Sequence, residues 1–114
     1  MGTFEVSGAG GLVLVADERG PSGAPPVLLL HGGGQTRHSW AGTASALADR
    51  GWRAITLDFR GHGESQWAPD GDYRLISFVG DTDAVVATLD QRPFLIGASL
   101  GGFTSMLLAG EIHP

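Results

Sequence analysis

The sequence predicts an α/β fold in which an N-terminal antiparallel hairpin precedes a mostly parallel sheet. From residue 26 onward, short apolar runs alternate with segments of helical periodicity, an order typical of strands joined by crossover helices. Each apolar run ends in a loop rich in glycine, as expected where parallel strands reach the ligand-binding edge of an open sheet. The 114 residues suffice for one domain with its own core.

The elements can be assigned in order along the chain. Apolar segments at 4–6 and 12–16 predict the two strands of a hairpin closed around residues 7–11. A loop rich in Gly, Pro and Ser, 17–25, leads to a strand at 27–30, whose four consecutive apolar residues indicate burial on both faces. The remaining predicted elements are a helix at 41–50, a strand at 53–57, a helix at 75–89, a strand at 94–96 and a helix at 100–112.

Residues 96–102 read Ile-Gly-Ala-Ser-Leu-Gly-Gly and fit a sharp turn that presents one serine between a strand and a helix. Such a turn places Ser99 in a strained backbone conformation with its hydroxyl above the sheet. Gly97 and Gly101 lie two residues to either side, where a Cβ would collide with a neighbouring element. The following helix would direct its free N–H groups at an anion formed there. Ser99 is therefore the predicted nucleophile.

A second glycine-rich loop reads His-Gly-Gly-Gly at 31–34 and follows the doubly buried strand. Acyl transfer places negative charge on a substrate oxygen, and two backbone N–H groups must approach that oxygen closely, which glycine permits. The sequence predicts that the N–H groups of Gly33 and Leu100 form this oxyanion hole, with Gly34 as the competing first donor. A flexible turn without a ligand is the alternative interpretation.

The loop after the strand 53–57 carries several polar residues between glycines. We expect Asp58, Arg60 and Ser65 to fix this loop through hydrogen bonds rather than to touch a substrate. His62 lies among them, but a lone histidine is more often structural or solvent-exposed than catalytic. The loop is therefore interpreted as a scaffold.

Together these three motifs resemble those of the α/β-hydrolase superfamily. The chain carries an oxyanion loop from His31 to Trp40, an Asp-x-Arg-Gly-x-Gly-x-Ser loop from Asp58 to Ser65, and a Gly-x-Ser-x-Gly-Gly elbow at 97–102, in the family's order and spacing. The resemblance implies that residues 1–114 form the N-terminal part of an α/β-hydrolase domain with an incomplete sheet. It also implies hydrolysis of esters or related acyl compounds through an acyl-enzyme. The haloalkane dehalogenases and epoxide hydrolases of this branch carry aspartate at the position of Ser99.

The same resemblance implies two catalytic partners that the chain lacks. The family places its acid and its histidine after the elbow, whereas this sequence ends at residue 114. A serine hydroxyl is a poor nucleophile without an adjacent base. His113 would lie far from Ser99 at the end of the last helix, and His62 is the least implausible substitute, although neither is expected to act as base. We expect a fragment with weak or no activity of its own; a catalytically dead binding or interaction module is the alternative.

Residues near the three loops are candidates for an apolar acyl pocket. These candidates are His31, Gly34, Trp40, Phe59, Trp67 and Phe103. Ordinary core packing is the alternative for each aromatic ring, and His31 is expected to hold backbone in place. Asp81 and Asp83 in the helix 75–89 are interpreted as charges on a solvated helix face or in the N-terminal turn of that helix.

Composition narrows the class of protein further. The net charge of −5 argues against nucleic acid as a partner, and a small ester or acyl compound is the expected substrate. No apolar run is long enough to cross a membrane and no secretory leader is recognised, so we expect a cytoplasmic location. The absence of cysteine excludes disulfides, and the histidine spacing predicts neither a metal site nor a cofactor.

The strand 94–96 would leave an apolar edge open to a second copy or a complementing chain.

Overall fold

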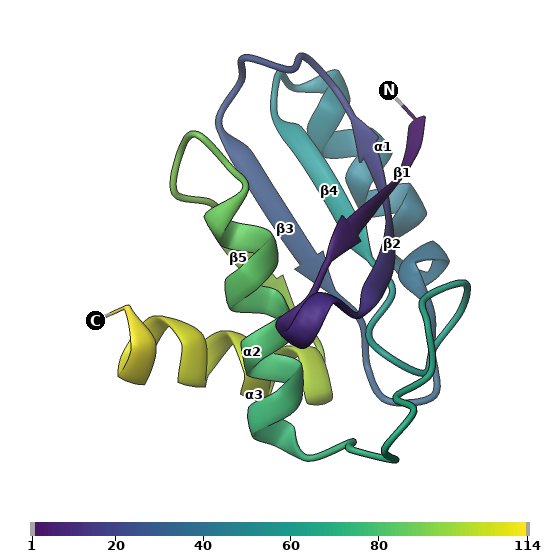
Figure 1. The fold of residues 1–114 in the computed structure, drawn as a ribbon. Coiled ribbons are helices and arrows are strands. Elements are labelled where there is room, and N and C mark those ends of the chain that lie inside the picture. Colours follow the sequence, from purple (N-terminus) through teal and green to yellow (C-terminus); the bar gives the residue numbers. More distant parts are fainter. Residues whose placement is uncertain (1, 114) are drawn as a thin grey trace.

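A five-stranded sheet forms the centre of the molecule in the computed structural model, which describes residues 2–113 (Figure 1). Its strands are β1 (Gly2–Ser7), β2 (Val13–Arg19), β3 (Pro26–Leu30), β4 (Arg53–Leu57) and β5 (Phe94–Gly97), in the spatial order β1-β2-β4-β3-β5. β2 runs antiparallel to both β1 and β4, whereas β3 runs parallel to both β4 and β5. The predicted hairpin and mostly parallel sheet are confirmed.

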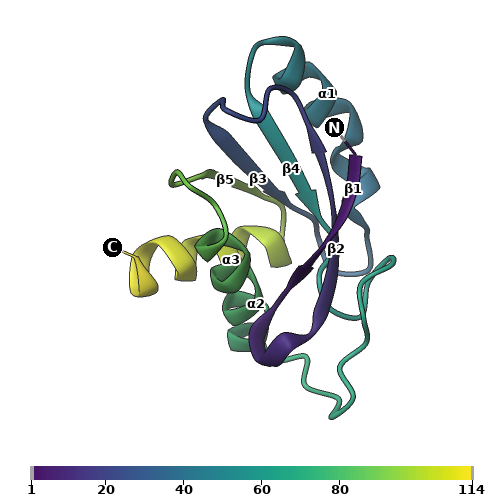
Figure 2. The same cartoon turned by 45° about the horizontal axis from the view of Figure 1, so that its top comes forward.

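Helices cover both faces of this sheet. α1 (Ala41–Asp49) packs on one face, and α2 (Leu75–Ala87) and α3 (Leu100–Leu107) pack on the other (Figure 2). Shorter helical turns occupy Ala9–Gly11, Arg37–Trp40 and Leu108–Ile112. Among residues 2–113, no helix has the length and apolar character that a membrane span requires.

The apolar run of β3 contributes side chains to the cores on both faces of the sheet. Leu28 and Leu30 face the core beneath α2, while Val27 and Leu29 face the smaller core beneath α1. All four side chains are buried, as expected for a parallel strand covered on both faces. β3 is therefore paired on both edges, by β4 and β5, and covered on both faces, so the loop that follows it starts from a rigid base.

β5 has a different environment because it pairs with β3 alone within residues 2–113. Its other edge is open, and Phe94 on this strand is 62% exposed. Phe103 and Met106 of α3 are also exposed. The open apolar edge expected from the sequence is thus present, and the sheet is incomplete at this side.

Candidate active site

Three loops meet at one edge of the sheet because β3, β4 and β5 are parallel and their carboxyl ends point the same way. We call residues 31–40 the β3 loop, residues 58–74 the β4 loop, and residues 97–101 the elbow. The predicted nucleophile and oxyanion donors lie on the β3 loop and the elbow. The β4 loop is hydrogen-bonded to the β3 loop.

Ser99 has the strained backbone that the sequence predicts. Its φ of 54° and ψ of −112° make it the single non-glycine residue with positive φ within residues 2–113. Such a conformation costs about 1–3 kcal/mol and persists only where its surroundings enforce it. β5 ends two residues earlier, and α3 begins at the next residue, Leu100. The serine is exposed at the first turn of the helix, where the Gly101 N–H donates to the Ala98 carbonyl oxygen over 3.0 Å and the Leu100 N–H has no acceptor within residues 2–113.

Close packing of the flanking glycines enforces this turn. A Cβ on Gly97 would collide with the backbone carbonyl of Gly101, and a Cβ on Gly101 would collide with the carbonyl oxygen of Leu30. The Ala98 N–H donates to the same Leu30 oxygen over 3.2 Å. The elbow is therefore fixed directly against the end of β3.

The two candidate glycine donors on the β3 loop differ in their hydrogen bonds. The Gly34 N–H donates to Nε2 of His62 over 3.0 Å. Gly33 is exposed, and within residues 2–113 neither its N–H nor that of Leu100 has an acceptor. The arrangement thus leaves Gly33 and Leu100 able to donate to a ligand, while Gly34 is already engaged.

Two histidine rings hold the β3 and β4 loops together. His31 is fully buried; its Nδ1 lies 2.7 Å from the Gly32 carbonyl oxygen, and its Nε2 accepts the Phe59 N–H over 3.0 Å. Burial lowers the pKa of His31 and so favours the neutral ring. His62 Nδ1 lies 2.9 Å from the Arg60 carbonyl oxygen. Both rings are thus saturated with backbone partners.

These contacts bear on the question of a catalytic base. Within residues 2–113, no histidine nitrogen forms a hydrogen bond with the Ser99 hydroxyl. The His113 ring instead contacts Asp83 of α2 over 2.6 Å. His62 and His113 thus each bond to groups other than Ser99.

A buried arginine that the sequence analysis did not single out also ties the two loops together. Arg37 is 3% exposed, and its guanidinium pairs with Asp58 at 2.5 Å, Glu64 at 2.7 Å and Asp17 at 3.0 Å. Burial opposes the charge, but the three carboxylates outweigh it and raise the pKa of Arg37. The one available clue was that Arg37 is the only arginine in the segment 31–40.

Asp58 is the fully buried centre of this network. Its carboxylate accepts the backbone N–H of Arg37 over 2.6 Å and that of Glu64 over 3.0 Å. The Ser65 hydroxyl donates to the Asp58 carbonyl oxygen over 2.6 Å and accepts the Val15 N–H over 2.8 Å. The predicted scaffold role of Asp58 and Ser65 is confirmed.

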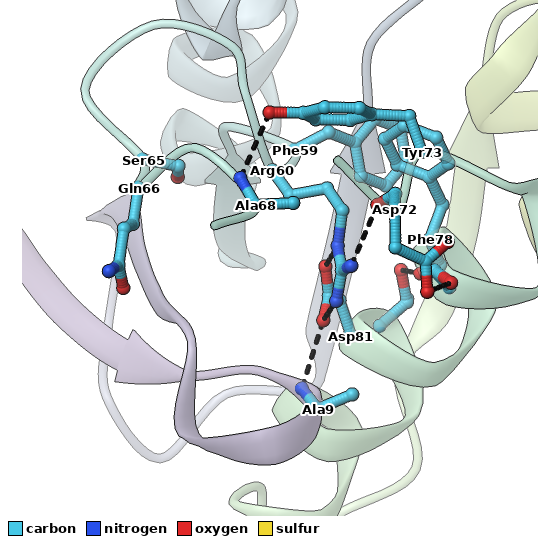
Figure 3. A network of polar contacts seen from close by, with 12 residues as sticks. Ala9, Phe59, Arg60, Ser65, Gln66, Ala68, Asp72, Tyr73, Phe78 and Asp81 are labelled. Atoms are coloured by element: carbon cyan, nitrogen blue, oxygen red, sulfur yellow. Dashed lines mark hydrogen bonds and ion pairs between the residues drawn. The ribbon is translucent and has the colours of Figure 1, made fainter. Parts of the chain in front are cut away.

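A second buried ion pair joins the β4 loop to α2 (Figure 3). Nε and Nη2 of Arg60 donate to the two carboxylate oxygens of Asp81 over 2.6 and 2.7 Å, and Nη1 donates to the Asp72 carbonyl oxygen over 2.9 Å. This pairing with Asp81 raises the pKa of Arg60. The Ala9 N–H adds a further bond to Asp81 over 2.9 Å. The predicted scaffold role of Arg60 is confirmed.

The interpretation of Asp81 as a solvated charge is wrong. Its side chain is fully buried, because it shares a helix face with Phe78 and Val85, three and four residues away. Bidentate pairing with Arg60 makes this burial of a carboxylate tolerable. Asp83 is half-exposed and keeps the character expected of it.

The residues proposed to line a pocket are scattered instead. Phe59 and His31 are fully buried and pack edge to face at 4.9 Å, the environment of core residues. Trp67 is 74% exposed, and Trp40 packs against the core beneath α1. A cavity of about 600 Å³ lies between the 9–11 turn, the β4 loop and α2, and Ser99 does not line it.

The fold and the elbow together define a class of protein, and comparison with known proteins places the chain in it. The profile of the family described as alpha/beta hydrolase fold matches residues 25–114. The chain therefore belongs to the α/β-hydrolase family, as the sequence motifs implied.

Individual relatives carry several hydrolase activities. The chain is 37% identical to an esterase of Mycobacterium tuberculosis, over 75% of this chain and 28% of that protein. It is 36% identical to an sn-1-specific diacylglycerol lipase of Mus musculus, over 79% of this chain and 29% of that protein. The crystal structure of an epoxide hydrolase from Vigna radiata superposes with a TM-score of 0.84 at 29% identity, over 93% of this chain and 34% of that one. The chain thus spans about a third or less of each.

Proposed function

We propose that this chain is the nucleophile-bearing part of a serine hydrolase that acts on carboxylic esters or related acyl compounds. The observation that carries the proposal is the conformation of Ser99, which is strained, exposed and enforced by the close packing of Gly97 and Gly101. A strained turn that serves only to connect a strand and a helix would be relieved by glycine at this position. Retaining serine there is consistent with a need for its hydroxyl.

The proposed reaction proceeds by acyl transfer. The Ser99 oxygen attacks the acyl carbon while a base removes its proton, and the substrate oxygen becomes an oxyanion. The N–H groups of Gly33 and Leu100 stabilise that oxyanion. The alcohol then departs with a proton, and water hydrolyses the acyl-serine to release the acid and restore the hydroxyl.

The substrate class rests on the nucleophile and on the relatives together. Esterase and lipase relatives favour carboxylic esters. The epoxide hydrolases of this branch carry aspartate as nucleophile, whereas this chain has Ser99, so epoxide opening is disfavoured. Carboxylic esters are therefore the first substrates to examine.

The base and the acid are proposed to come from residues outside these 114. Within residues 2–113 the Ser99 hydroxyl has no histidine partner, and the rings of His31 and His62 are saturated by backbone groups. The open edge of β5, with exposed Phe94, is the surface on which a complementing segment would extend the sheet. The isolated chain is expected to turn over p-nitrophenyl acetate only weakly.

Labelling with a fluorophosphonate probe tests the proposal. We expect Ser99 to be labelled when a complementing segment is present, and Ser99→Ala to abolish the label. Absence of labelling in the complemented protein would contradict the proposal. It would favour the alternative of a catalytically dead binding or interaction module, for which the missing histidine partner is the specific observation.

A further inference from the structure

The β3 and β4 loops exchange hydrogen bonds through two histidines in a reciprocal way. His31 of the β3 loop accepts the N–H of Phe59 from the β4 loop, and His62 of the β4 loop accepts the N–H of Gly34 from the β3 loop. The two rings lie 5.0 Å apart between centroids. We call this pair the histidine clasp.

Both rings of the clasp must be neutral for these bonds to exist. In each ring Nε2 accepts a backbone N–H, so it carries no proton, and Nδ1 carries the proton that it donates to a carbonyl oxygen. Protonation of His62 at Nε2 would set two N–H groups against each other and break the bond to Gly34. The geometry of the glycine loop therefore depends on a neutral His62.

The rings and charged groups around His62 are uncharged or already paired with other groups. The β3 loop presents His31, and α2 presents the uncharged ring of Phe78 at 6.3 Å. The guanidinium of Arg60 is directed to Asp81. The carboxylate of Asp58 is taken by Arg37 and two backbone N–H groups.

We propose that His62 is a positioning residue that removes Gly34 from the oxyanion hole and thereby leaves Gly33 as the donor that works with Leu100. This inference rests on the proposed function of Ser99. It resolves a choice between two adjacent glycines that the sequence leaves open. It also makes the oxyanion loop sensitive to acid through a residue that does not touch the reacting atoms.

Amide hydrogen exchange and ¹⁵N NMR of the 114-residue chain test the clasp directly. At about pH 8 we expect His62 to show a protonated Nδ1 and an unprotonated Nε2, with the Gly34 amide protected and the Gly33 amide exchanging freely. As the pH is lowered and ¹⁵N NMR records protonation of the His62 ring, the Gly34 amide should lose protection in step with that protonation. The protection factor of Gly34, which compares its exchange with that of an unprotected amide at the same pH, should then fall about tenfold.

Variants distinguish the hydrogen bond from simple packing. His62→Phe keeps a ring but has no acceptor, so Gly34 should lose protection at every pH. His62→Gln keeps an acceptor that does not titrate, so protection should be retained and its pH dependence abolished. His38→Gln is the control, because His38 is an exposed histidine of the same β3 loop. It should change neither.

The outcomes separate this inference from the proposed function. Protection of Gly34 that is unchanged in His62→Phe, or that survives protonation of His62, would overturn the clasp whatever Ser99 does. In the complemented protein, His62→Phe should slow fluorophosphonate labelling of Ser99 at about pH 8, and His62→Gln should restore it. An intact clasp with no labelling of the parent protein would instead reject the serine hydrolase and leave the clasp as a structural feature.

Discussion

The three loops at the carboxyl edge of the sheet differ sharply in how completely their polar groups are satisfied. The β3 and β4 loops are joined by the histidine clasp and by the buried Arg37–Asp58 pair. The elbow is instead fixed by steric contact with β3, and its Ser99 hydroxyl is exposed without a histidine partner in residues 2–113. The β3 and β4 loops are thus bonded to each other, whereas the groups that would activate Ser99 are not among their residues.

Among substitutions in the hydrogen-bonded β3 and β4 loops, the largest loss of stability is expected at Asp58. Asp58→Ala leaves the Arg37 guanidinium buried beside only two carboxylates and removes the acceptor of two backbone N–H groups. Removing one partner of a buried pair costs about 3–5 kcal/mol. Urea denaturation should show a loss of this size in the free energy of unfolding.

Glu64 provides the matched control for Asp58. Its side chain contacts the same guanidinium at 2.7 Å but is 68% exposed. Glu64→Ala should therefore cost no more than about 1 kcal/mol. Equal losses for the two variants would mean that burial does not decide the strength of this network.

The close packing that holds the elbow is tested next by adding a Cβ to one of its glycines. Gly101→Ala drives a Cβ into the Leu30 carbonyl, and the backbone must shift because no flexible side chain can yield. Overpacking of this kind costs about 1–3 kcal/mol. The free energy of unfolding should fall accordingly.

Gly102→Ala is the control for the elbow. Its Cβ would meet the Gly97 oxygen at 3.5 Å, which is ordinary contact. Its stability should match the parent or rise slightly, since alanine favours a helix. A Gly101→Ala variant as stable as Gly102→Ala would show that the elbow is held by something other than close packing.

The contrast between the two regions also separates what the sequence predicts from what it does not. The elbow is a local feature, because the spacing of Gly97, Ser99 and Gly101 between an apolar run and a helix contains the whole steric argument. The strands are recognised for the same reason, since burial of β3 on both faces follows from four consecutive apolar residues.

The hydrogen bonds and ion pairs of the β3 and β4 loops join residues that are distant in sequence. Arg37 finds Asp17 and Asp58, and Asp81 finds Arg60, across 20 or more residues in each case. Nothing in the local pattern of an aspartate on a helix distinguishes a solvated charge from one that faces a buried arginine. The burial of Asp81 and of Arg37 therefore became visible only once the fold brought their partners together.

The pH dependence of the free energy of unfolding tests the buried His31 that joins the β3 and β4 loops. Because burial lowers the pKa of His31 in the folded chain, the unfolded chain binds this proton more readily. Stability from this residue is fully present above the unfolded value of about 6.5 and is lost as the pH falls below it. The slope for one proton is at most about 1.4 kcal/mol per pH unit.

Urea denaturation between about pH 8 and pH 5 measures this slope. His31→Gln should reduce it, and His38→Gln should leave it unchanged. Hydrogen bonds from Thr3 and Arg37 outweigh the effect of burial and lower the pKa of Asp17. The stability that Asp17 contributes is therefore also lost as the pH falls, but only in more acidic solution, near the ordinary range of aspartate. A flat stability profile across neutral pH would contradict a buried neutral His31.

The smallest expected effect concerns the strain at the open elbow. Ser99→Gly removes the Cβ from a residue held at φ 54° and ψ −112°, where a side chain costs about 1–3 kcal/mol. Glycine gains flexibility in the unfolded chain, which offsets part of this gain by about 0.5–1 kcal/mol. The variant should therefore be more stable than the parent by about 1 kcal/mol, whereas Ser99→Ala, which keeps the Cβ, should leave stability unchanged. If glycine instead destabilised the chain as it does within an ordinary helix, the turn would not be strained, and the conformational argument for Ser99 as nucleophile would lose its basis.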